Sequence, residues 1–243
     1  MTYVMSDLHG CYDQYSQMLK KISFSDNDTL YVLGDVVDYG EKPIEILRDM
    51  SMRANVIPIL GNHEYAAFEI LKQLCLVDIT PNGINKKPGS DIDLDTFVFE
   101  VQVWHDIGGE PTMKGFGQLP EDERDFFLEY LEEFSLYEMI KVNGSKYLLT
   151  HIGLPKGATR GNLGRYDAYD FVATPDTDID YRKKYFDDIT IVTGHKPTFH
   201  IGEEHRGKVF RENNHLAIDT GGAFGECFAC VCLETQEEFY VTA

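Results

Sequence analysis

The stretch Leu33-Gly34-Asp35-Val36-Val37-Asp38-Tyr39-Gly40 decides the fold of this chain. The apolar run Leu30–Leu33 leads into it and predicts a buried strand. Gly34 permits a tight turn at the end of that strand, which places Asp35 at the strand's carboxyl end. Open α/β sheets bind their ligands at the carboxyl ends of their strands. We therefore expect Asp35 to lie at the centre of the functional site.

Other turns of the chain also place polar side chains directly after apolar runs. Three of them are Met5–Gly10, Leu60–Glu64 and Val192–His195, and the apolar run 147–150 similarly ends at His151. Helical spacing of apolar residues at 12–22 and 43–52 alternates with the first three predicted strands. This alternation argues for parallel strands whose carboxyl ends share one edge.

The side chains at these strand ends combine carboxylate, amide and imidazole groups. Six of them are candidate metal ligands: Asp7, His9, Asp35, Asn62, His151 and His195. Two ions held about 3.5–4 Å apart need a shared carboxylate, and Asp35 is the candidate bridge. The mixture of nitrogen and oxygen ligands predicts two divalent transition-metal ions, with Mn as first choice and Fe, Zn, Co or Ni as alternatives.

Two further residues are candidates for catalysis rather than metal binding. His63 adjoins the candidate ligand Asn62, and Asp38 lies three residues after Asp35 on the same loop. A carboxylate beside an imidazole raises the pKa of the imidazole and keeps it protonated, as a general acid requires. We expect Asp38 and His63 to act as such a pair.

The middle of the chain differs from the parts before and after it. A helix is predicted from Glu64 to about residue 76, a loop rich in Pro and Gly over 78–95, and helices over 97–104 and from residue 119 onward. We interpret the chain as a single domain, 1–243, with a lid-like helical and loop insertion at about 65–135. The part of this insertion between residues 78 and 118 is expected to influence the choice of substrate.

The last third of the chain predicts β-structure. Asn143-Gly144 separates two strand-like runs and predicts a hairpin. Residues 153–188 are expected to be rich in loops, and a strand is predicted at 189–193. Two or three more strands, among 208–210, 216–218 and 228–233, are expected to pair antiparallel.

Composition narrows the classes of partner. The chain has 243 residues, with 22 Lys and Arg against 41 Asp and Glu, which gives a formal charge of −19. Such acidity disfavours nucleic acid and anionic membranes as partners. No apolar run approaches the roughly 20 residues that span a bilayer. With five cysteines and no signal peptide, we expect a soluble, cytoplasmic protein.

Taken together, these motifs resemble those of the calcineurin-like metallophosphoesterases, and most closely the branch of phosphoprotein phosphatases and symmetrical diadenosine-tetraphosphate hydrolases. The matching segments are Asp7–Gly10, Gly34–Asp38, Gly61–Glu64, His151, Gly194-His195, Trp104–Thr112 and Ile218–Gly221. The resemblance implies an α/β (α+β) fold in which two mixed β-sheets pack as a sandwich flanked by helices. It also implies a dinuclear centre, where a bridging hydroxide attacks a phosphate ester and His63 protonates the leaving oxygen.

One position departs from the family's pattern. Tyr39 stands where these phosphatases carry an arginine that clamps the substrate phosphate. A phenol cannot form the two charged hydrogen bonds of a guanidinium. We therefore list Tyr39 as a substrate-binding position and expect Arg160 and Arg165, in the loop after His151, to supply positive charge.

Three functions remain open from the sequence. The first is a serine/threonine-type protein phosphatase or general phosphomonoesterase, acting on a phosphoprotein or a small phosphoester. The alternative is a hydrolase of dinucleoside polyphosphates such as diadenosine tetraphosphate. A third, from another class, is a metal-binding interaction module without catalysis, which the presence of both His63 and Asp38 disfavours.

Overall fold

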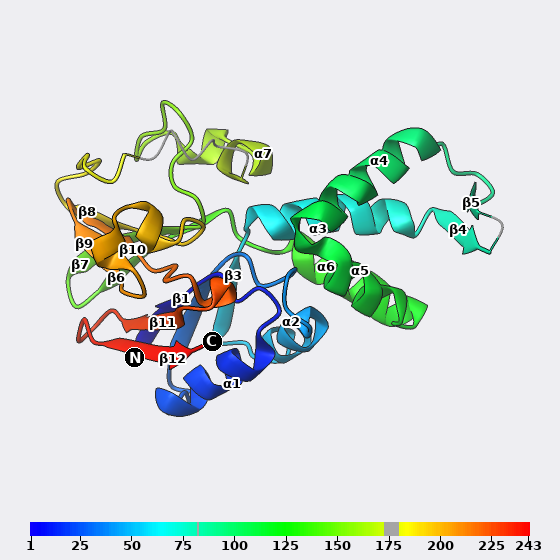
Figure 1. Ribbon diagram of the computed structural model, residues 1–243. Helices are drawn as coiled ribbons and strands as arrows, with labels where there is room; N and C mark the ends of the chain where they lie inside the picture. The colour runs from blue at the N-terminus through cyan, green and yellow to red at the C-terminus, as the bar shows by residue number, and fades with distance from the viewer. Residues whose placement is uncertain (82, 173–179) are drawn as a thin grey trace.

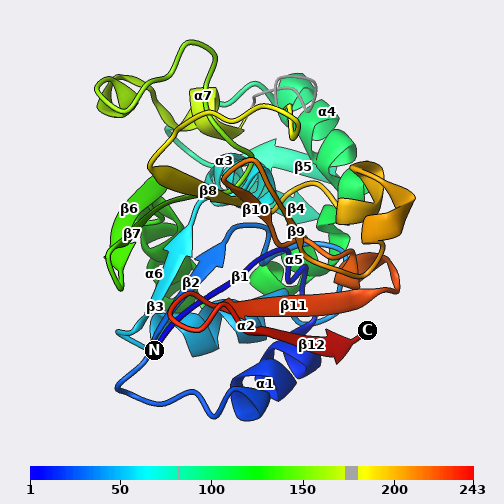
Figure 2. The same ribbon diagram turned by 90° about the vertical axis from the view of Figure 1, so that its left-hand side faces the viewer.

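The protein is built around two β-sheets packed face to face, as seen in a computed structural model that describes residues 1–81, 83–172 and 180–243. Helices α1 (Tyr12–Lys21) and α2 (Pro43–Ser51) lie on one side of the first sheet, and the second sheet lies on its other side (Figures 1 and 2). Two mixed sheets flanked by helices are the fold class expected from the sequence, which is thereby confirmed.

The first sheet has the strand order β12-β11-β1-β2-β3. Its strands are β1 (Thr2–Met5), β2 (Thr29–Leu33), β3 (Val56–Ile59), β11 (Cys227–Cys232) and β12 (Glu238–Thr242). β1, β2 and β3 run parallel, while β11 pairs antiparallel with β1 and with β12. The parallel arrangement of the first three strands was predicted, whereas β12 was not, because only Val241 among its residues is buried.

The second sheet has the order β6-β7-β8-β10-β9. Its strands are β6 (Tyr137–Val142), β7 (Ser145–Thr150), β8 (Ile189–Thr193), β9 (Phe210–Glu212) and β10 (His215–Ala217). The hairpin predicted around Asn143-Gly144 is present as β6–β7. The prediction of purely antiparallel pairing in the tail is wrong for β10, which pairs antiparallel with β9 but parallel with β8. The alternation of side chains along a strand is the same in both kinds of pairing, so it cannot distinguish them.

Apolar side chains of the two sheets form the core between them. Val4, Leu33 and Ile59 of the first sheet pack with Leu149 and Val192 of the second. The opposite face of the first sheet is also buried, under apolar side chains of the flanking helices, among them Tyr15, Met18, Ile44 and Leu47. Burial of both faces explains why β1 and β2 are almost continuously apolar.

The segment between β3 and β6 forms an arm that extends away from the sandwich (Figure 1). It consists of α3 (Asn62–Leu74), β4 (Val77–Thr80), β5 (Gly83–Lys86), α4 (Leu94–Trp104), η1 (His105–Gly109), α5 (Glu110–Gly117) and α6 (Glu121–Glu132). This arm occupies the place of the predicted lid-like insertion; the division of the chain into a domain with an insertion stays a prediction.

Two parts of the arm differ from the sequence-based expectation. The segment expected to be a loop over 78–95 contains the antiparallel pair β4–β5, whose short, exposed strands carry little apolar signal. Helix α5 was not predicted either, since Gly108, Gly109 and Pro111 are residues typical of turns. Pro111 instead occupies the first turn of α5, where its missing N–H costs no hydrogen bond.

The connection from β7 to β8 was expected to be rich in loops over 153–188. It contains the short helices η2 (Leu163–Arg165) and α7 (Ala168–Val172), and its residues 173–179 lie outside the described part of the chain. Within the described residues, no helix combines the length and the apolar character needed to cross a bilayer.

The buried His215 of β10 makes the stability of the fold dependent on pH. Burial lowers its pKa to about 4, and Thr193 Oγ1 lies 2.8 Å from its Nε2. The unfolded chain, with an ordinary pKa near 6.5, takes up a proton that the folded chain does not, so stability falls as the pH falls. Between pH 7 and pH 5 this one ring should lower the free energy of unfolding by about 2 kcal/mol.

The variant His215→Phe, which keeps a planar ring against Tyr181, should lack this contribution. We expect urea unfolding with chelator present to show a drop between pH 7 and pH 5 that is smaller than in the wild type by about 2 kcal/mol. An equal drop in both proteins would contradict the assignment.

Candidate active site and metal centre

The strand-end loops of the two sheets converge on one site. The loops after β1 and β2 are joined by backbone hydrogen bonds, from Asp7 N to Gly34 O at 3.0 Å and from His9 N to Asp35 O at 2.8 Å. Several site residues adopt left-handed backbone conformations that non-glycine residues rarely enter, namely Asp7, His9, Asp35, Asp38, Tyr39 and His195. Such conformations persist only where the surroundings fix them, and they gather at functional sites.

The carboxylate of Asp35 faces two groups of side chains, one with each oxygen. Its Oδ1 lies 3.2 Å from His151 Nε2. Its Oδ2 lies 3.8 Å from His9 Nε2 and 4.0 Å from His63 Nε2. A carboxylate with this orientation can bridge two cations, as predicted for Asp35 from the sequence.

Backbone carbonyls fix the orientation of two imidazoles. His9 Nδ1 lies 3.0 Å from Val37 O, and His151 Nδ1 lies 2.7 Å from Leu33 O. A ring nitrogen that donates to a carbonyl leaves the other nitrogen available as a metal ligand. In both residues that other nitrogen, Nε2, is the atom that approaches Asp35.

The remaining three candidate ligands lie in the same cluster. Asn62 Oδ1 is 3.0 Å from His151 Nε2. The ring centroids of His151 and His195 are 5.1 Å apart. The backbone nitrogen of His195 lies 3.0 Å from each carboxylate oxygen of Asp7, to which its N–H donates. The structure therefore brings all six predicted ligand residues together, although their roles as ligands stay a proposal.

The donor set is suited to cations. Donor atoms of His9, Asp35 and His63 lie within 4.8 Å of one another, as do those of Asp35, His151 and His195. Burial and the charge of Asp219 raise the pKa of Asp7 well above its usual range, and burial raises that of Asp219 to about 7. Such crowding of buried carboxylates is relieved by positive charge, so the residues present fit bound metal ions.

Glu64 supports the site through its hydrogen bonds, and the sequence analysis did not name it among the candidate site residues. Its side chain is fully buried and accepts hydrogen bonds from the backbone N–H groups of Asp35, Val36, Val37 and Gly61, at 2.7 to 3.1 Å. One carboxylate thus holds the start of α3 and the loop that carries Asp35. The spacing from Gly61 to Glu64, which matches a helix capping box, was the signal that could have revealed it.

His63 and Asp38 form the expected pair, with 2.7 Å between His63 Nδ1 and Asp38 Oδ2. Burial opposes the charged ring, but Asp35 and the hydrogen bond to Asp38 outweigh it and raise the pKa of His63 to about 9. The arm holds Asp38 in place, because Trp104 Nε1 donates to its Oδ2 at 2.9 Å and Thr112 Oγ1 to its Oδ1 at 2.7 Å. The segment 104–112 thereby belongs to the site.

The predicted substrate-binding residues separate into two groups. Tyr39 lies at the site, with its ring 4.9 Å from that of His9 and 5.4 Å from that of His63. Arg160 instead pairs at 3.5 Å with Asp188, which precedes β8, whereas His195 follows the other end of that strand. Arg165 is exposed in η2. The structure does not bring Arg160 to the cluster, and the phosphate-binding role of both arginines stays a prediction.

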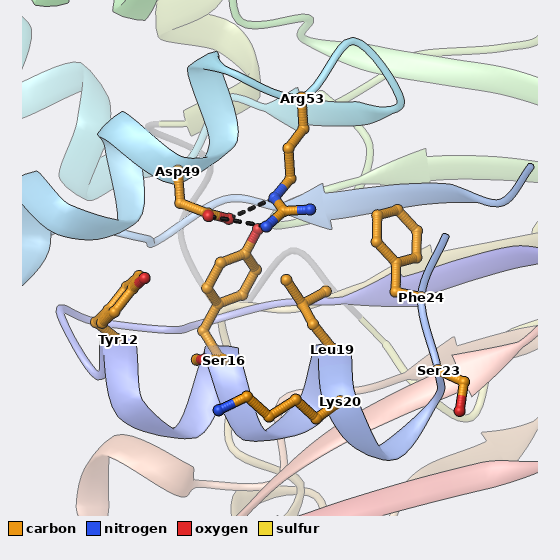
Figure 3. A pocket seen from close by; sticks show the side chains of 9 residues that line it. Tyr12, Ser16, Leu19, Lys20, Ser23, Phe24, Asp49 and Arg53 are labelled. Atoms are coloured by element: carbon orange, nitrogen blue, oxygen red, sulfur yellow. Dashed lines mark hydrogen bonds and ion pairs between the residues drawn. The ribbon is translucent and has the colours of Figure 1, made fainter. Parts of the chain in front are cut away.

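A separate cavity of about 350 Å³ lies between α1 and α2 (Figure 3). Asp49 and Arg53 pair with each other at its wall, at 2.7 and 3.0 Å. It contains none of the candidate ligands, so the strand-end cluster remains the candidate active site.

Comparison with known proteins agrees with this geometry. Residues 2–220 match the sequence pattern of the calcineurin-like phosphoesterases. The chain belongs to this family. It is therefore a hydrolase of a family that uses divalent metal ions, as the sequence analysis expected.

Individual relatives share shorter or more distant similarity. The chain is 43% identical over 65 residues to a symmetrical bis(5'-nucleosyl)-tetraphosphatase of Haemophilus ducreyi, and 42% identical over 65 residues to that of Buchnera aphidicola. Those matches span 26% of this chain and 24% and 23% of the two relatives. The activity of these relatives therefore does not transfer to this chain without a test.

Two solved structures show the same fold over the whole chain. One, whose description proposes a diadenosine tetraphosphatase, has a TM-score of 0.65 at 15% identity, covering 100% of this chain and 93% of the other. A serine/threonine phosphatase of Saccharomyces cerevisiae has a TM-score of 0.56 at 14% identity, covering 100% and 79%. At such identity the likeness establishes the fold alone.

The substitution Glu64→Gln tests the link between α3 and the Asp35 loop. An amide offers one acceptor oxygen and places donors against backbone N–H groups, so buried hydrogen bonds are lost. We expect the free energy of unfolding, measured with urea in chelator, to fall by about 2–4 kcal/mol. The amount of Mn that stays bound to the protein after dialysis should also fall.

Glu69→Gln is the matched control, since Glu69 lies on the same helix with an exposed side chain. It should change stability by less than about 0.5 kcal/mol. Equal effects of the two substitutions would show that the contacts of Glu64 do not support the site.

Proposed function

We propose that this enzyme hydrolyses a phosphoric anhydride bond in dinucleoside polyphosphates at a dinuclear metal centre. The observation that carries the dinuclear centre is the carboxylate of Asp35, whose two oxygens face separate groups of imidazoles. The choice of substrate class is supported by the local identity to symmetrical tetraphosphatases. Tyr39, a neutral side chain at the position of a phosphate-clamping arginine, is compatible with a substrate that does not rely on a clamped terminal phosphate.

In the proposed centre Asp35 would be a ligand of both ions. Asp7 and His9 would help to hold one ion, and Asn62, His151 and His195 would hold the other. Bound divalent ions of this kind supply a nucleophilic water at neutral pH and offset the charge of the phosphate group. Mn is the first choice because the ligands mix nitrogen with oxygen, with Fe, Zn, Co or Ni as alternatives.

His63 is the proposed general acid for the leaving oxygen. Its Nδ1 lies 2.7 Å from Asp38, and its Nε2 is on the side of Asp35. With a pKa of about 9 the ring is protonated at neutral pH. In this proposal His63 donates a proton on the side of Asp35 and does not act as a metal ligand.

The serine/threonine phosphatase that the sequence analysis placed first is not confirmed by the relatives, whose names are those of tetraphosphatases. A phosphoprotein therefore enters as a competing substrate in the test. The partners remain a phosphorylated small molecule or protein, and the exclusion of nucleic acid and the cytoplasmic location stay predictions.

A substrate panel tests the proposed function directly. With Mn present, kcat/KM should be at least tenfold higher for diadenosine tetraphosphate than for a phosphoserine peptide or glycerol phosphate, and chelation should abolish turnover of all three. Symmetrical cleavage should release ADP as the only nucleotide. Faster turnover of the phosphopeptide would establish the protein phosphatase instead, and metal binding without any turnover would favour the non-catalytic module.

The substitution His63→Asn tests the general acid. On glycerol phosphate, whose leaving alcohol needs a proton, we expect kcat to fall by roughly 10²–10⁴. On p-nitrophenyl phosphate, whose leaving group needs none, the loss should be smaller. Metal content measured in parallel should stay near the wild-type value; a metal-free variant would show that His63 is a ligand instead.

A further inference from the structure

Two exposed aromatic rings, Tyr39 and Phe224, stand together at the edge of the candidate site, and we name this pair the aromatic rim. Their exposed fractions are 44% and 56%. Their ring centroids are 5.8 Å apart at an interplanar angle of 67°. Large apolar surfaces left open beside a polar site commonly mark a place where a ligand is covered.

The rim adjoins the residues proposed to carry out the chemistry. The Tyr39 ring contacts His9 and His63, with centroids 4.9 and 5.4 Å apart, and the Phe224 ring lies 6.4 Å from that of His9. The two rings come from distant parts of the chain, the loop after β2 and the turn η6 (Gly222–Phe224) before β11. The fold therefore assembles the rim at the same edge as the metal-binding groups.

Local backbone structure positions both residues. Tyr39 N donates to Gly108 O at 2.8 Å, and a Cβ on Gly108 would lie 2.7 Å from the Tyr39 ring. Phe224 lies between Gly221 and Gly225, whose φ values of 83° and 91° belong to the left-handed region that favours glycine. A side chain whose backbone is held in place loses less conformational freedom when a ligand packs on it.

We propose that the aromatic rim stacks one nucleobase of the substrate; this inference rests on the proposed function and specifies how the same site selects nucleotides. Apart from the charge that bound metal ions would supply, Tyr39 adds no positive charge at the expected phosphate clamp, and the net charge of −19 opposes the binding of an anion. Stacking on an aromatic side chain supplies binding free energy without positive charge and accepts any base.

The extent of the rim suits a base more than the ring of phosphotyrosine. A phenyl ring is bonded directly to the ester oxygen and would remain beside His63. The rim begins there with Tyr39 and continues to Phe224, which contacts the rings of His9 and Tyr39. In symmetrical cleavage a base is separated from the cleaved bond of a dinucleoside tetraphosphate by its ribose and two phosphates, so it can reach this outer ring.

The test compares Phe224→Leu, which removes the ring but keeps apolar character, with Phe224→Tyr, which keeps the ring. We expect Phe224→Leu to lower kcat/KM for diadenosine tetraphosphate about tenfold or more, chiefly through KM. Turnover of inorganic tripolyphosphate, which has no base, should stay within about twofold of the wild-type rate, and Phe224→Tyr should retain activity on both.

Phe126→Leu is the matched control, because Phe126 is 48% exposed on α6 and its recorded ring contacts are with Phe127 and Tyr130. This variant should turn over diadenosine tetraphosphate and tripolyphosphate as the wild type does. Equal losses on both substrates in Phe224→Leu would overturn the proposal, since the ring would then support the centre rather than bind a base. An unchanged KM for the nucleotide would overturn it as well.

Equilibrium binding separates this proposal from the proposed function. Calorimetry with Mn-loaded protein should show ADP binding more tightly than pyrophosphate, and Phe224→Leu should remove most of that difference. If the wild type fails to cleave diadenosine tetraphosphate but keeps this preference for ADP, the proposed function fails and the rim stands. If ADP and pyrophosphate bind equally, or only a phosphotyrosine peptide responds to Phe224→Leu, the rim does not bind a base.

Discussion

The site depends on one buried carboxylate that satisfies four backbone donors. Glu64 accepts the N–H groups of Asp35, Val36, Val37 and Gly61. Without an acceptor, these buried donors would each cost about 1–3 kcal/mol. Burial and the nearby charge of Asp35 raise the pKa of Glu64 to about 7. Keeping this carboxylate charged in the folded protein therefore costs electrostatic free energy. Positive charge at Asp35 would relieve that cost, which links the metal centre to the stability of the loop that builds it.

The part of the arm beyond α3 contributes to the site through Asp38 rather than through the candidate metal ligands. Trp104 and Thr112 donate to the two oxygens of Asp38, and Asp38 in turn contacts His63. The six candidate ligands come from loops at the ends of the sandwich strands and from the first residue of α3. The contacts of Trp104 and Thr112 thus reach the proposed proton donor through Asp38 and involve none of the six candidate ligands directly.

The sequence predicted the parts of the site that depend on local order. A polar residue that comes at the end of an apolar strand lies at the sheet edge, and this rule alone predicted that Asp7, Asp35, Asn62, His151 and His195 lie together. A Gly precedes the polar residue at Asp35, Asn62 and His195. It could not predict contacts between residues far apart, such as Glu64 with Val37 or Trp104 with Asp38, because these depend on how the elements pack. The exposed strands β4, β5 and β12 were missed for the related reason that few of their side chains join a core.

Tyr39 shows why a departure from a family's pattern needs the surrounding structure for its interpretation. Considered alone, a phenol in place of an arginine weakens phosphate binding, since a neutral hydrogen bond contributes about 0.5–1.5 kcal/mol and a charged one about 1.5–3. Next to Phe224, however, the Tyr39 ring forms one half of the aromatic rim, and an arginine at this position would not supply an aromatic ring. Stacking on a ring does not depend on the net charge of the protein. In the proposal made above, the departure moves part of the binding of the substrate from its phosphate to its base, and it leaves the residues around Asp35 in place.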